Sequence, residues 1–320
     1  MTIPHVTVAI PVYNREDCIG SCIESVLNQT VSPFEIMIVD DGSTDRTKEI
    51  ISKYTCISDK ISFFAAPKNG GENYARNRCV EYAKGEFIFW LDSDDELVPD
   101  AIENINKALT GNSGFLHYMF LTSDRQTEFQ DNSAFSQNLH VTTYQDWVTF
   151  NVSGDFAHLM HRSVFEGLPF FEQIRGFPGI NFLRIHRKTK EQLFVNQLVT
   201  VRDRNRTDAL CLTGYLTNKK SIWEQYVNNN FYFDYFEDDL LRFNKKLLEK
   251  KAKKNILLGI AINETKANKA VIKRLKSKKV NLFPVNVLNL RFVAPLVYSI
   301  ITNYVKFKQR AAKPSMAGQI

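Results

Sequence analysis

Four short apolar runs, separated by segments long enough for a helix, constrain the fold of this chain more than any other feature of its sequence. The runs cover residues 6–10, 34–39, 61–65 and 87–91. Strands that are apolar at nearly every position are typical of a parallel sheet that helices cover on both faces. The sequence therefore predicts an α/β fold with a mostly parallel central sheet flanked by helices.

Polar residues follow three of these runs directly. Pro11-Val-Tyr-Asn14 follows the first run, Asp40-Asp41 the second, and Asp92-Ser-Asp-Asp95 the fourth. Ligands of open parallel sheets bind at the carboxyl ends of the strands. We therefore expect the three clusters to converge on one crevice.

The acidic cluster Asp92–Asp95 places three carboxylates within four positions, where they repel one another. A hard divalent cation held by oxygen ligands would offset this repulsion. A solvated acidic turn is the alternative, because Asp-x-Asp spacing is common in turns. Convergence with the two other polar strand ends favours the metal site.

The rest of the chain carries weaker signals. A strand is expected over residues 115–121, a short aromatic helix over 144–150, a strand or helix start at 159–162 and one or two strands over 193–201. From residue 221 onward the apolar and aromatic residues recur at helical spacing. We expect this stripe to pack in a core rather than to bind a cofactor.

The chain of 320 residues is 44% hydrophobic and 24% charged, which is the balance of a soluble globular protein. Its net charge of +6 is unevenly divided, with −11 over residues 1–239 and +17 over residues 240–320. Nucleic acid, an anionic membrane surface or a polyanionic substrate could each bind such a basic region. Nucleic acid is disfavoured as a partner, because the lysines of 245–279 lack interleaved exposed aromatics or a recognisable motif.

The apolar stretch 285–305 lies between lysine clusters. Arg291 and Pro295 within it argue against a spanning helix. Two alternatives stay open: an amphipathic helix lying in an anionic headgroup layer, or a helix packed on the domain. The N-terminal residues show no secretory signal, so we expect a cytoplasmic protein, either free or peripheral on the inner face of the cytoplasmic membrane.

Four strings within residues 6–100 together resemble glycosyltransferase family 2 of the bacterial polysaccharide or lipo-oligosaccharide type. They are Val8-Ala-Ile-Pro-Val-Tyr-Asn14, Ile38-Val-Asp-Asp-Gly-Ser-Thr-Asp45, Asn69-Gly-Gly71 with Ala75-Arg-Asn77, and Gly85-Glu-Phe-Ile-Phe-Trp-Leu-Asp-Ser-Asp-Asp95. The resemblance implies the GT-A fold, a Rossmann-like α/β fold, here with a helical C-terminal extension. It divides the chain into a nucleotide-sugar-binding half (1–110), an acceptor-binding half (111–220) and a basic helical region that could associate with membranes (221–320).

The resemblance also implies a divalent cation, Mn or Mg, across the phosphates of a nucleotide-sugar donor. UDP is the commonest carrier in this family. Asp94 matches the family's metal-binding aspartate. Asp92 matches the first aspartate of that motif, near the ribose and the metal.

Further positions match residues that bind the donor's nucleoside. Pro11 and Tyr13 match residues that border it, and Arg76 matches an arginine that donates to the base or the diphosphate. Asp40 and Asp41 match a pair that accepts hydrogen bonds from the base. Of the two, Asp41 is the expected direct contact, and Asp40 is expected to shape the turn.

The reaction implied is an inverting displacement, in which a carboxylate deprotonates the hydroxyl of a saccharide or lipid-linked saccharide acceptor. The sequence departs from the family at the position expected for this base, because residue 178 is proline. Glu172, Asp155 and His161 are the candidates that remain. The alternative is a nucleotide-sugar-binding or scaffold protein with impaired catalysis. The sequence leaves the sugar, the linkage and the oligomeric state open.

Overall fold

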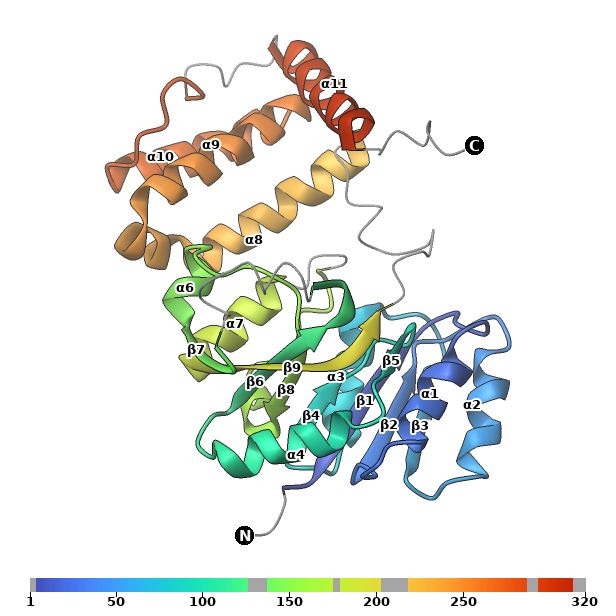
Figure 1. The fold of residues 1–320 in the computed structure, drawn as a ribbon. Helices are drawn as coiled ribbons and strands as arrows, with labels where there is room; N and C mark the ends of the chain where they lie inside the picture. The colour runs from blue at the N-terminus through green and yellow to red at the C-terminus, as the bar shows by residue number, and fades with distance from the viewer. Residues whose placement is uncertain (1–3, 126–136, 175–178, 203–217, 287–292, 313–320) are drawn as a thin grey trace, which may run out of the picture. The chain divides into compact units, whose positions relative to one another are not determined.

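The computed structural model describes residues 4–125, 137–174, 179–202, 218–286 and 293–312. The chain divides into two compact units, Met1–Arg206 (unit 1) and Thr207–Ile320 (unit 2). Figure 1 shows unit 1 as a sheet with helices and unit 2 as a set of helices. The functional roles assigned above to residues 1–110, 111–220 and 221–320 remain predictions.

The first half of unit 1 alternates strands and helices as predicted. Its elements are β1 (Val6–Val12), α1 (Ile19–Leu27), β2 (Glu35–Asp40), α2 (Thr47–Thr55), β3 (Ile61–Ala65), α3 (Glu72–Tyr82) and β4 (Phe87–Trp90). The four strands are parallel and stand in the order β3-β2-β1-β4. This half therefore contains the parallel sheet that the apolar runs predict.

The second half of unit 1 extends the sheet in a mixed pattern. Its elements are β5 (Asp95–Leu97), α4 (Ala101–Gly111), β6 (His117–Thr122), β7 (Leu139–Thr143), α6 (Tyr144–Val148), β8 (Ala157–His161), α7 (Gly179–Thr189) and β9 (Glu191–Arg202). The strand order continues as β4-β8-β6-β9-β5, with β7 also paired to β9. In this half β6 and β9 are parallel, whereas the other pairs are antiparallel.

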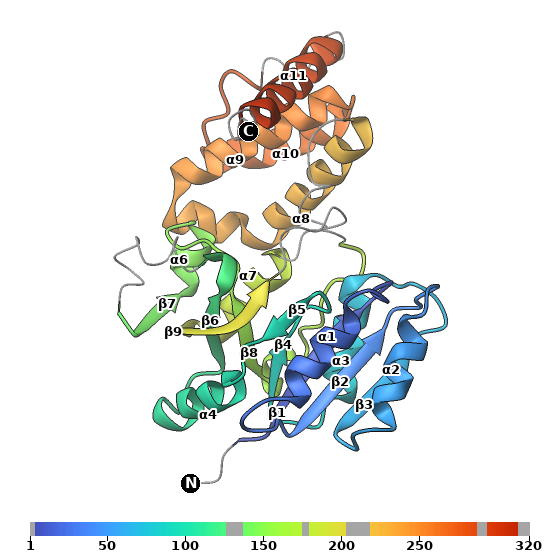
Figure 2. The ribbon, with the colours of Figure 1, turned by 45° about the vertical axis from the view of Figure 1, so that its right-hand side comes forward.

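Alternate residues of the central strands face opposite layers of helices. Ile10 of β1 packs in the cluster that contains α1 and α4, and Ala9 packs in the cluster that contains α3 and α7. Figure 2 shows α1 in front of the strands. Burial on both faces explains why the strands are apolar at nearly every position.

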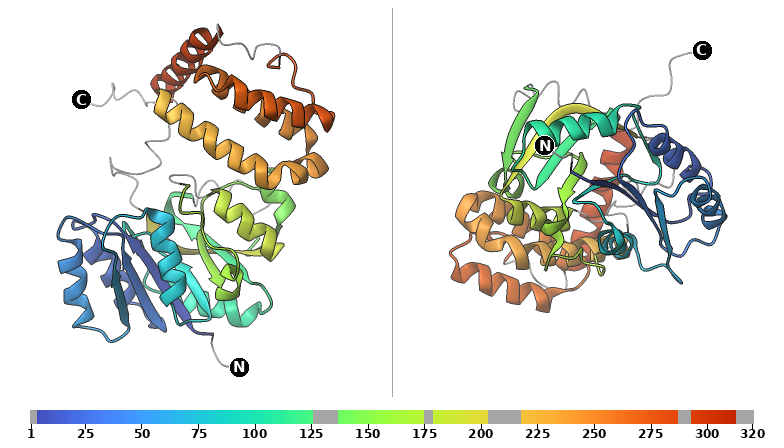
Figure 3. Two further views of the ribbon diagram at one scale, coloured as in Figure 1. Left: turned by 180° about the vertical axis from the view of Figure 1, so that it is seen from behind. Right: turned by 90° about the horizontal axis from the view of Figure 1, so that it is seen from below.

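Unit 2 is helical in its described part, as predicted from residue 221 onward (Figures 1 and 3). It consists of α8 (Lys219–Phe243), α9 (Lys245–Ala261), α10 (Thr265–Ser277) and α11 (Ala294–Ala312). Tyr226, Phe233 and Phe236 of α8 are buried, so this part of the aromatic stripe is core.

Helix α11 covers most of the apolar stretch whose role the sequence left open; residues 287–292 lie outside the described ranges. Val297 and Ile301 pack against a cluster that includes Leu258 of α9. Leu296 and Ile300, in contrast, are exposed. One face of α11 is therefore packed against other helices of unit 2, and a second apolar face is exposed. Within the described ranges, none of the helices combines the length and the apolar character needed to cross a bilayer.

Candidate active site

The carboxyl ends of β1, β2 and β4 lie together at one edge of the sheet, as predicted. Asp41 N donates to Val12 O at 2.8 Å, and Leu91 N donates to Ala9 O at 3.0 Å. The three polar clusters therefore start from neighbouring positions. Side-chain hydrogen bonds then join the loops to one another.

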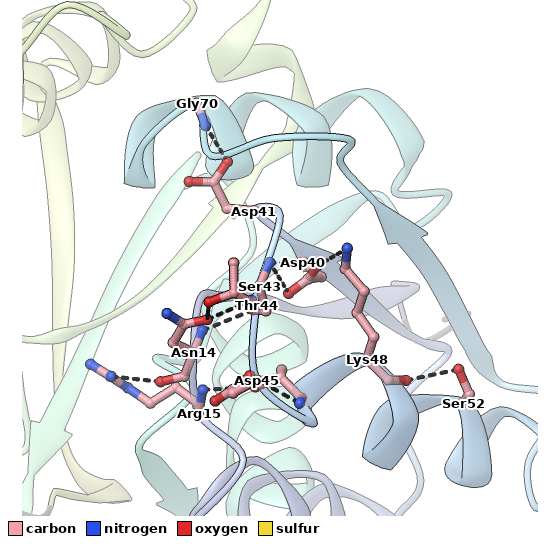
Figure 4. Close-up of polar contacts among 11 residues, drawn as sticks. Asn14, Arg15, Asp40, Asp41, Ser43, Thr44, Asp45, Lys48, Ser52 and Gly70 are labelled. Atoms are coloured by element: carbon pink, nitrogen blue, oxygen red, sulfur yellow. Dashed lines mark hydrogen bonds and ion pairs between the residues drawn. The ribbon is translucent and has the colours of Figure 1, made fainter.

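The loops that follow β1 and β2 are bonded to each other through Asn14 (Figure 4). Asn14 N donates to Ser43 Oγ at 2.8 Å, and Thr44 N donates to Asn14 Oδ1 at 2.8 Å. Asn14 has a φ of 50°, in the left-handed region that asparagine tolerates better than most residues. The side chain and the backbone conformation of Asn14 thus fix the two loops together.

Asp40 and Asp41 both have structural partners. The buried carboxylate of Asp40 accepts from Ser43 N at 3.1 Å and lies 3.6 Å from Lys48 Nζ. Asp41 accepts a hydrogen bond from Gly70 N at 2.8 Å (Figure 4). It also accepts one from Gly71 N at 2.7 Å, so the end of β2 is bonded to the turn before α3. Asp40 has the contacts expected of a residue that shapes the turn. A contact of Asp41 with a base stays a prediction.

Pro11 and Tyr13 differ in their accessibility. Pro11 is buried within β1, where it pairs with Val39 of β2. The Tyr13 side chain is 41% exposed. The Tyr13 ring is therefore accessible to a ligand, whereas Pro11 is covered by its neighbours. A contact of either residue with a nucleoside stays a prediction.

Arg76 on α3 reaches the acidic cluster. It forms an ion pair with Glu72 one turn earlier, and its Nη2 lies 3.5 Å from Asp92 Oδ1. Burial alone would lower the pKa of Arg76, but the carboxylates of Glu72 and Asp92 outweigh it, so the pKa is raised. Within the described part of the chain, Arg76 Nε has no hydrogen-bond partner. A buried, permanently charged guanidinium with a spare N–H group suits a phosphate or carbonyl oxygen.

Two further arginines contact the acidic cluster. Arg15 Nη2, from the loop after β1, lies 3.8 Å from Asp94 Oδ2, and Arg202 Nε, from β9, lies 3.3 Å from Asp95 Oδ2. The sequence patterns did not identify either residue. Arg15 directly follows the Asn14 string, but Arg202 lies more than 100 positions from Asp95, and only the β5–β9 pairing brings them together.

Two thiols, that of Cys18 directly before α1 and that of Cys22 within it, contact the backbone of the acidic cluster. Cys18 Sγ lies 3.6 Å from Ser93 O, and Cys22 Sγ lies 3.7 Å from Asp92 O. The pKa of the Cys22 thiol is raised well above its ordinary value, mainly by burial and to a lesser extent by the neighbouring Asp95. Cys22 is therefore a packing residue and not a nucleophile.

The acidic cluster contains the two carboxylates that could bind a divalent cation, Asp92 and Asp94. The Asp92 side chain is about half exposed and the Asp94 side chain a quarter exposed, so both carboxylates are accessible to a ligand at this edge of the sheet. Among the residues that the structure describes, no group of three or more His, Cys, Asp or Glu side chains could hold a metal ion. Mg²⁺ commonly binds through one or two carboxylates plus substrate phosphates. The pair Asp92 and Asp94 fits a cation that arrives with a diphosphate.

The candidates for the base lie in different places. Asn77 of α3 donates to Glu172 Oε1 at 2.9 Å, next to Arg76. Asp155 Oδ2 lies 2.8 Å from Arg202 Nη1. His161 pairs with Phe87, at the opposite end of β4 from the acidic cluster. Position 178 lies outside the described residues.

Three histidines form a buried stack in the second half of unit 1. His117 Nε2 and His158 Nδ1 are 2.9 Å apart, and His186 stacks between His117 and Trp147 at centroid distances of 5.0 and 4.4 Å. Burial lowers the pKa of His186 to about 3. The pKa values of His117 and His158 are lowered well below the ordinary range, mainly by burial and to a lesser extent by the neighbouring His186. The stack is therefore neutral at physiological pH.

Comparison with known sequences identifies the family. The sequence profile of "Glycosyl transferase family 2" matches residues 7–167, about half of the chain. The chain is 46% identical over 101 residues to the chondroitin synthase of Pasteurella multocida (strain Pm70), which covers 32% of this chain and 10% of the synthase. It is 26% identical over 190 residues to the "GalNAc(5)-diNAcBac-PP-undecaprenol beta-1,3-glucosyltransferase" of Campylobacter jejuni, which covers 58% of this chain and 60% of that enzyme. The chain thus spans less than two thirds of the length of either relative.

Comparison with solved structures identifies the fold. The crystal structure of S. aureus TarS 1-349 in complex with UDP-GlcNAc superposes with a TM-score of 0.59 at 14% identity. The superposition covers 97% of this chain and 93% of that one. It confirms the predicted GT-A fold with a helical C-terminal region. The strand order, the four motifs at the sheet edge and the profile match together place this chain in glycosyltransferase family 2.

Proposed function

We propose that this protein is a metal-dependent, inverting glycosyltransferase that uses a nucleotide-sugar donor. The donor we propose is a UDP-sugar. The observation that carries the proposal is the convergence of side chains at the carboxyl ends of β1, β2 and β4. There Tyr13, Asp41, Arg76 and Asp92 gather from four separate segments. The UDP-GlcNAc complex of TarS, a protein of the same fold, supports this donor class.

Each of these residues has a distinct role in this proposal. Tyr13 offers its ring to the base, and Asp41 accepts a hydrogen bond from it. Arg76 donates to the diphosphate, where its fixed charge stabilises the negative charge that develops on the leaving group. Asp92 and Asp94 would hold Mn²⁺ or Mg²⁺, which supplies Lewis-acid stabilisation of the same charge when bound.

We assign the role of the base to Glu172 rather than to Asp155. It lies beside α3 through the bond from Asn77, whereas Asp155 is engaged by the buried Arg202. A carboxylate base must take the proton of the acceptor hydroxyl, and a neutral amide donor lowers its affinity for a proton less than a guanidinium does. We expect Glu172→Gln to lower kcat by at least about 100-fold with little change in donor affinity. A smaller effect for Glu172→Gln than for Asp155→Asn would exclude this assignment.

A donor panel tests the activity. UDP-, GDP- and dTDP-linked sugars would be incubated with the protein, with and without Mn²⁺, and release of the nucleotide would be measured with and without saccharide acceptors. We expect turnover of a UDP-sugar that EDTA abolishes and added Mn²⁺ restores. Turnover that is insensitive to EDTA would refute the proposed metal dependence. The absence of turnover with every donor would refute the proposed glycosyltransferase activity.

The proposed acceptor is a saccharide or a lipid-linked saccharide of surface polysaccharide synthesis, used on the cytoplasmic side of the membrane. The named activity of the Campylobacter relative, which involves an undecaprenol-linked saccharide, supports this class. Unit 2 supplies two features that suit an anionic membrane surface. The exposed Leu296, Ile300 and Tyr304 share one face of α11, and lysines share a face of α10.

A second candidate is a nucleotide-sugar-binding protein with impaired catalysis. Pro178 motivates it, because an acidic residue would be expected at this position. This candidate predicts that calorimetry detects binding of UDP-sugars while no acceptor is glycosylated. Any acceptor-dependent turnover above a Glu172→Gln control would rule it out.

A further inference from the structure

Arg202 ends β9 and joins three parts of unit 1 through one buried guanidinium, which is only 7% exposed. Its Nη1 lies 2.8 Å from Asp155 Oδ2 and 3.8 Å from Asp124 Oδ1. Its Nη2 donates to Phe156 O at 3.4 Å. Its Nε lies 3.3 Å from Asp95 Oδ2, an ion pair without the angle of a hydrogen bond. One side chain thus contacts groups from several different segments.

The backbone of Arg202 is fixed as firmly as its side chain. Arg202 N donates to Ser123 Oγ at 3.0 Å, and Arg202 is the register partner of Asp95 in the antiparallel pair of β9 with β5. Val98 N donates to Val199 O at 3.0 Å at the other end of this pair. Strand β5 has only three residues, so its position depends on β9 rather than on its own pattern.

Strand β5 begins where the acidic cluster ends. Asp95 N donates to Asp92 O at 3.0 Å, so the turn that carries Asp92 and Asp94 closes on the residue that Arg202 holds. The Asp95 carboxylate is nearly buried, and a buried carboxylate without a positive partner is strongly unfavourable. Loss of the guanidinium would remove this ion pair and weaken the link between β9 and the turn that ends at Asp95.

We propose that Arg202 is a positioning residue for the donor site: it holds Asp95 and thereby fixes Asp92 and Asp94 at the edge of the sheet. The role of this turn in donor binding rests on the proposed function. The effect of Arg202 on the position of the turn does not, because it concerns the protein without any ligand. Asp155, in the same arrangement, anchors the guanidinium and is not the base.

Amide hydrogen exchange of the ligand-free protein tests the core of the proposal. We expect Arg202→Met to accelerate exchange at residues 92–97 by at least about ten-fold, with little change at residues 35–40 of β2. Arg162→Met, an exposed arginine of the same unit, is the matched control and should leave both segments unchanged. Unchanged exchange at 92–97, or equal acceleration in both segments, would overturn the proposal.

A double-mutant cycle identifies the contact responsible. Asp95→Asn should accelerate exchange over the same residues, and the double variant should do no more than the larger single change, because both remove one interaction. Arg202→Lys keeps the charge and should recover part of the protection. Additive effects of the two single changes would show that Arg202 does not act through Asp95.

Binding of UDP with Mn²⁺, measured by calorimetry, connects the proposal to the donor site. Arg202→Met should weaken this affinity by about ten-fold, and Arg202→Lys by less. If the parent protein binds no UDP with any divalent cation, the proposed donor class fails, and the exchange experiment still decides the role of Arg202. If the parent binds and Arg202→Met binds equally well, the role of Arg202 at the donor site is refuted.

Discussion

Gly42 shows how a single residue shapes the candidate site. It follows the Asp40-Asp41 pair with a φ of 74°, in the left-handed region. A Cβ atom at this position would lie 2.5 Å from the carbonyl carbon of Lys68 and 2.7 Å from Asn69 N. The turn can therefore approach β2 closely enough for Asp41 to accept both of its N–H groups only when residue 42 has no side chain.

Gly42→Ala should destabilise unit 1 by about 2–4 kcal/mol, because it combines a strained φ with a backbone clash. Gly111→Ala is the matched control: at the end of α4 nothing lies within 4 Å of the added methyl group, and the change should be neutral or slightly stabilising. Urea unfolding followed by circular dichroism measures both. Equal stability of the two variants would contradict the role of the close approach.

The buried histidines predict how the stability of unit 1 depends on pH. The unfolded chain binds protons at these imidazoles below about pH 6.5, whereas the folded state keeps them neutral to much lower pH. The stability present above pH 6.5 is therefore lost as the pH falls, by up to about 1.4 kcal/mol per pH unit for each histidine. Urea unfolding between pH 7.5 and 5 measures this slope.

His186→Phe should make that slope shallower, since an aromatic ring can keep the stacking on Trp147 without binding a proton. His161→Gln serves as the control, because His161 lies outside the stack and accepts a local bond from Ser163 N at 3.3 Å. A slope unaffected by His186→Phe would show that the stack does not govern the acid sensitivity.

Among the elements, helices α8 and α10 of unit 2 are joined by a buried carboxylate. Glu237 is 4% exposed, and its oxygens lie 3.0 Å from Arg274 Nη2 and 2.7 Å from Lys278 Nζ. Asp234 and Asp238 also contact these cations but from the surface. The buried member of this group holds the two helices together, and the exposed members add little.

Glu237→Gln should destabilise unit 2 by about 1–3 kcal/mol, because it leaves two cations facing a neutral group at a buried position. Asp238→Asn removes a carboxylate that is 84% exposed and should cost less than about 1 kcal/mol. Thermal unfolding of both variants provides the comparison. Equal losses would indicate that the surface contacts matter as much as the buried one.

The elements also show which parts of the fold the sequence could predict. Strands β1 to β4 and helices α1 to α3 follow from local patterns, because each is specified by its own apolar spacing. Strands β5 and β7 were not predicted, since β5 has three residues, two of them acidic, and exists through its pairing with β9. Helix α7, which begins at Gly179, was not predicted either.

In the candidate site, too, the residues in local motifs could be predicted from the sequence and those that depend on long-range pairing could not. Asp40, Asp41, Arg76 and Asp92 lie in strings that are recognisable from neighbouring residues, and the structure brings them to one edge of the sheet. Arg15 and Arg202 were missed, because their contacts with Asp94 and Asp95 depend on long-range pairing that no local pattern records.

For the molecule as a whole, the uneven charge predicts salt-dependent binding to anionic vesicles. The exposed residues Lys266, Lys269, Lys273 and Lys276 fall on one face of α10. Changing all four to glutamine should weaken binding to phosphatidylserine vesicles by at least about ten-fold, at roughly 1 kcal/mol per lysine near the surface. Vesicle co-sedimentation at two salt concentrations measures the effect.

Lys53→Gln with Lys107→Gln changes two exposed lysines of unit 1 and is the control for this experiment. It should leave vesicle binding unchanged. Equal binding of the parent to neutral and anionic vesicles, or no binding at low salt, would remove the membrane surface from the proposed partners.

The contacts at the sheet edge connect their segments in sequence: Asn14 to Ser43 and Thr44, Asp41 to Gly70 and Gly71, Arg76 to Asp92, and Asp94 back to Arg15. These links form a closed ring, since the last one returns to the loop where the first begins. In a closed ring, the effect of one substitution depends on whether the other links are intact. Variants of this site should therefore combine non-additively, and homologous sites should exchange these residues in groups rather than singly.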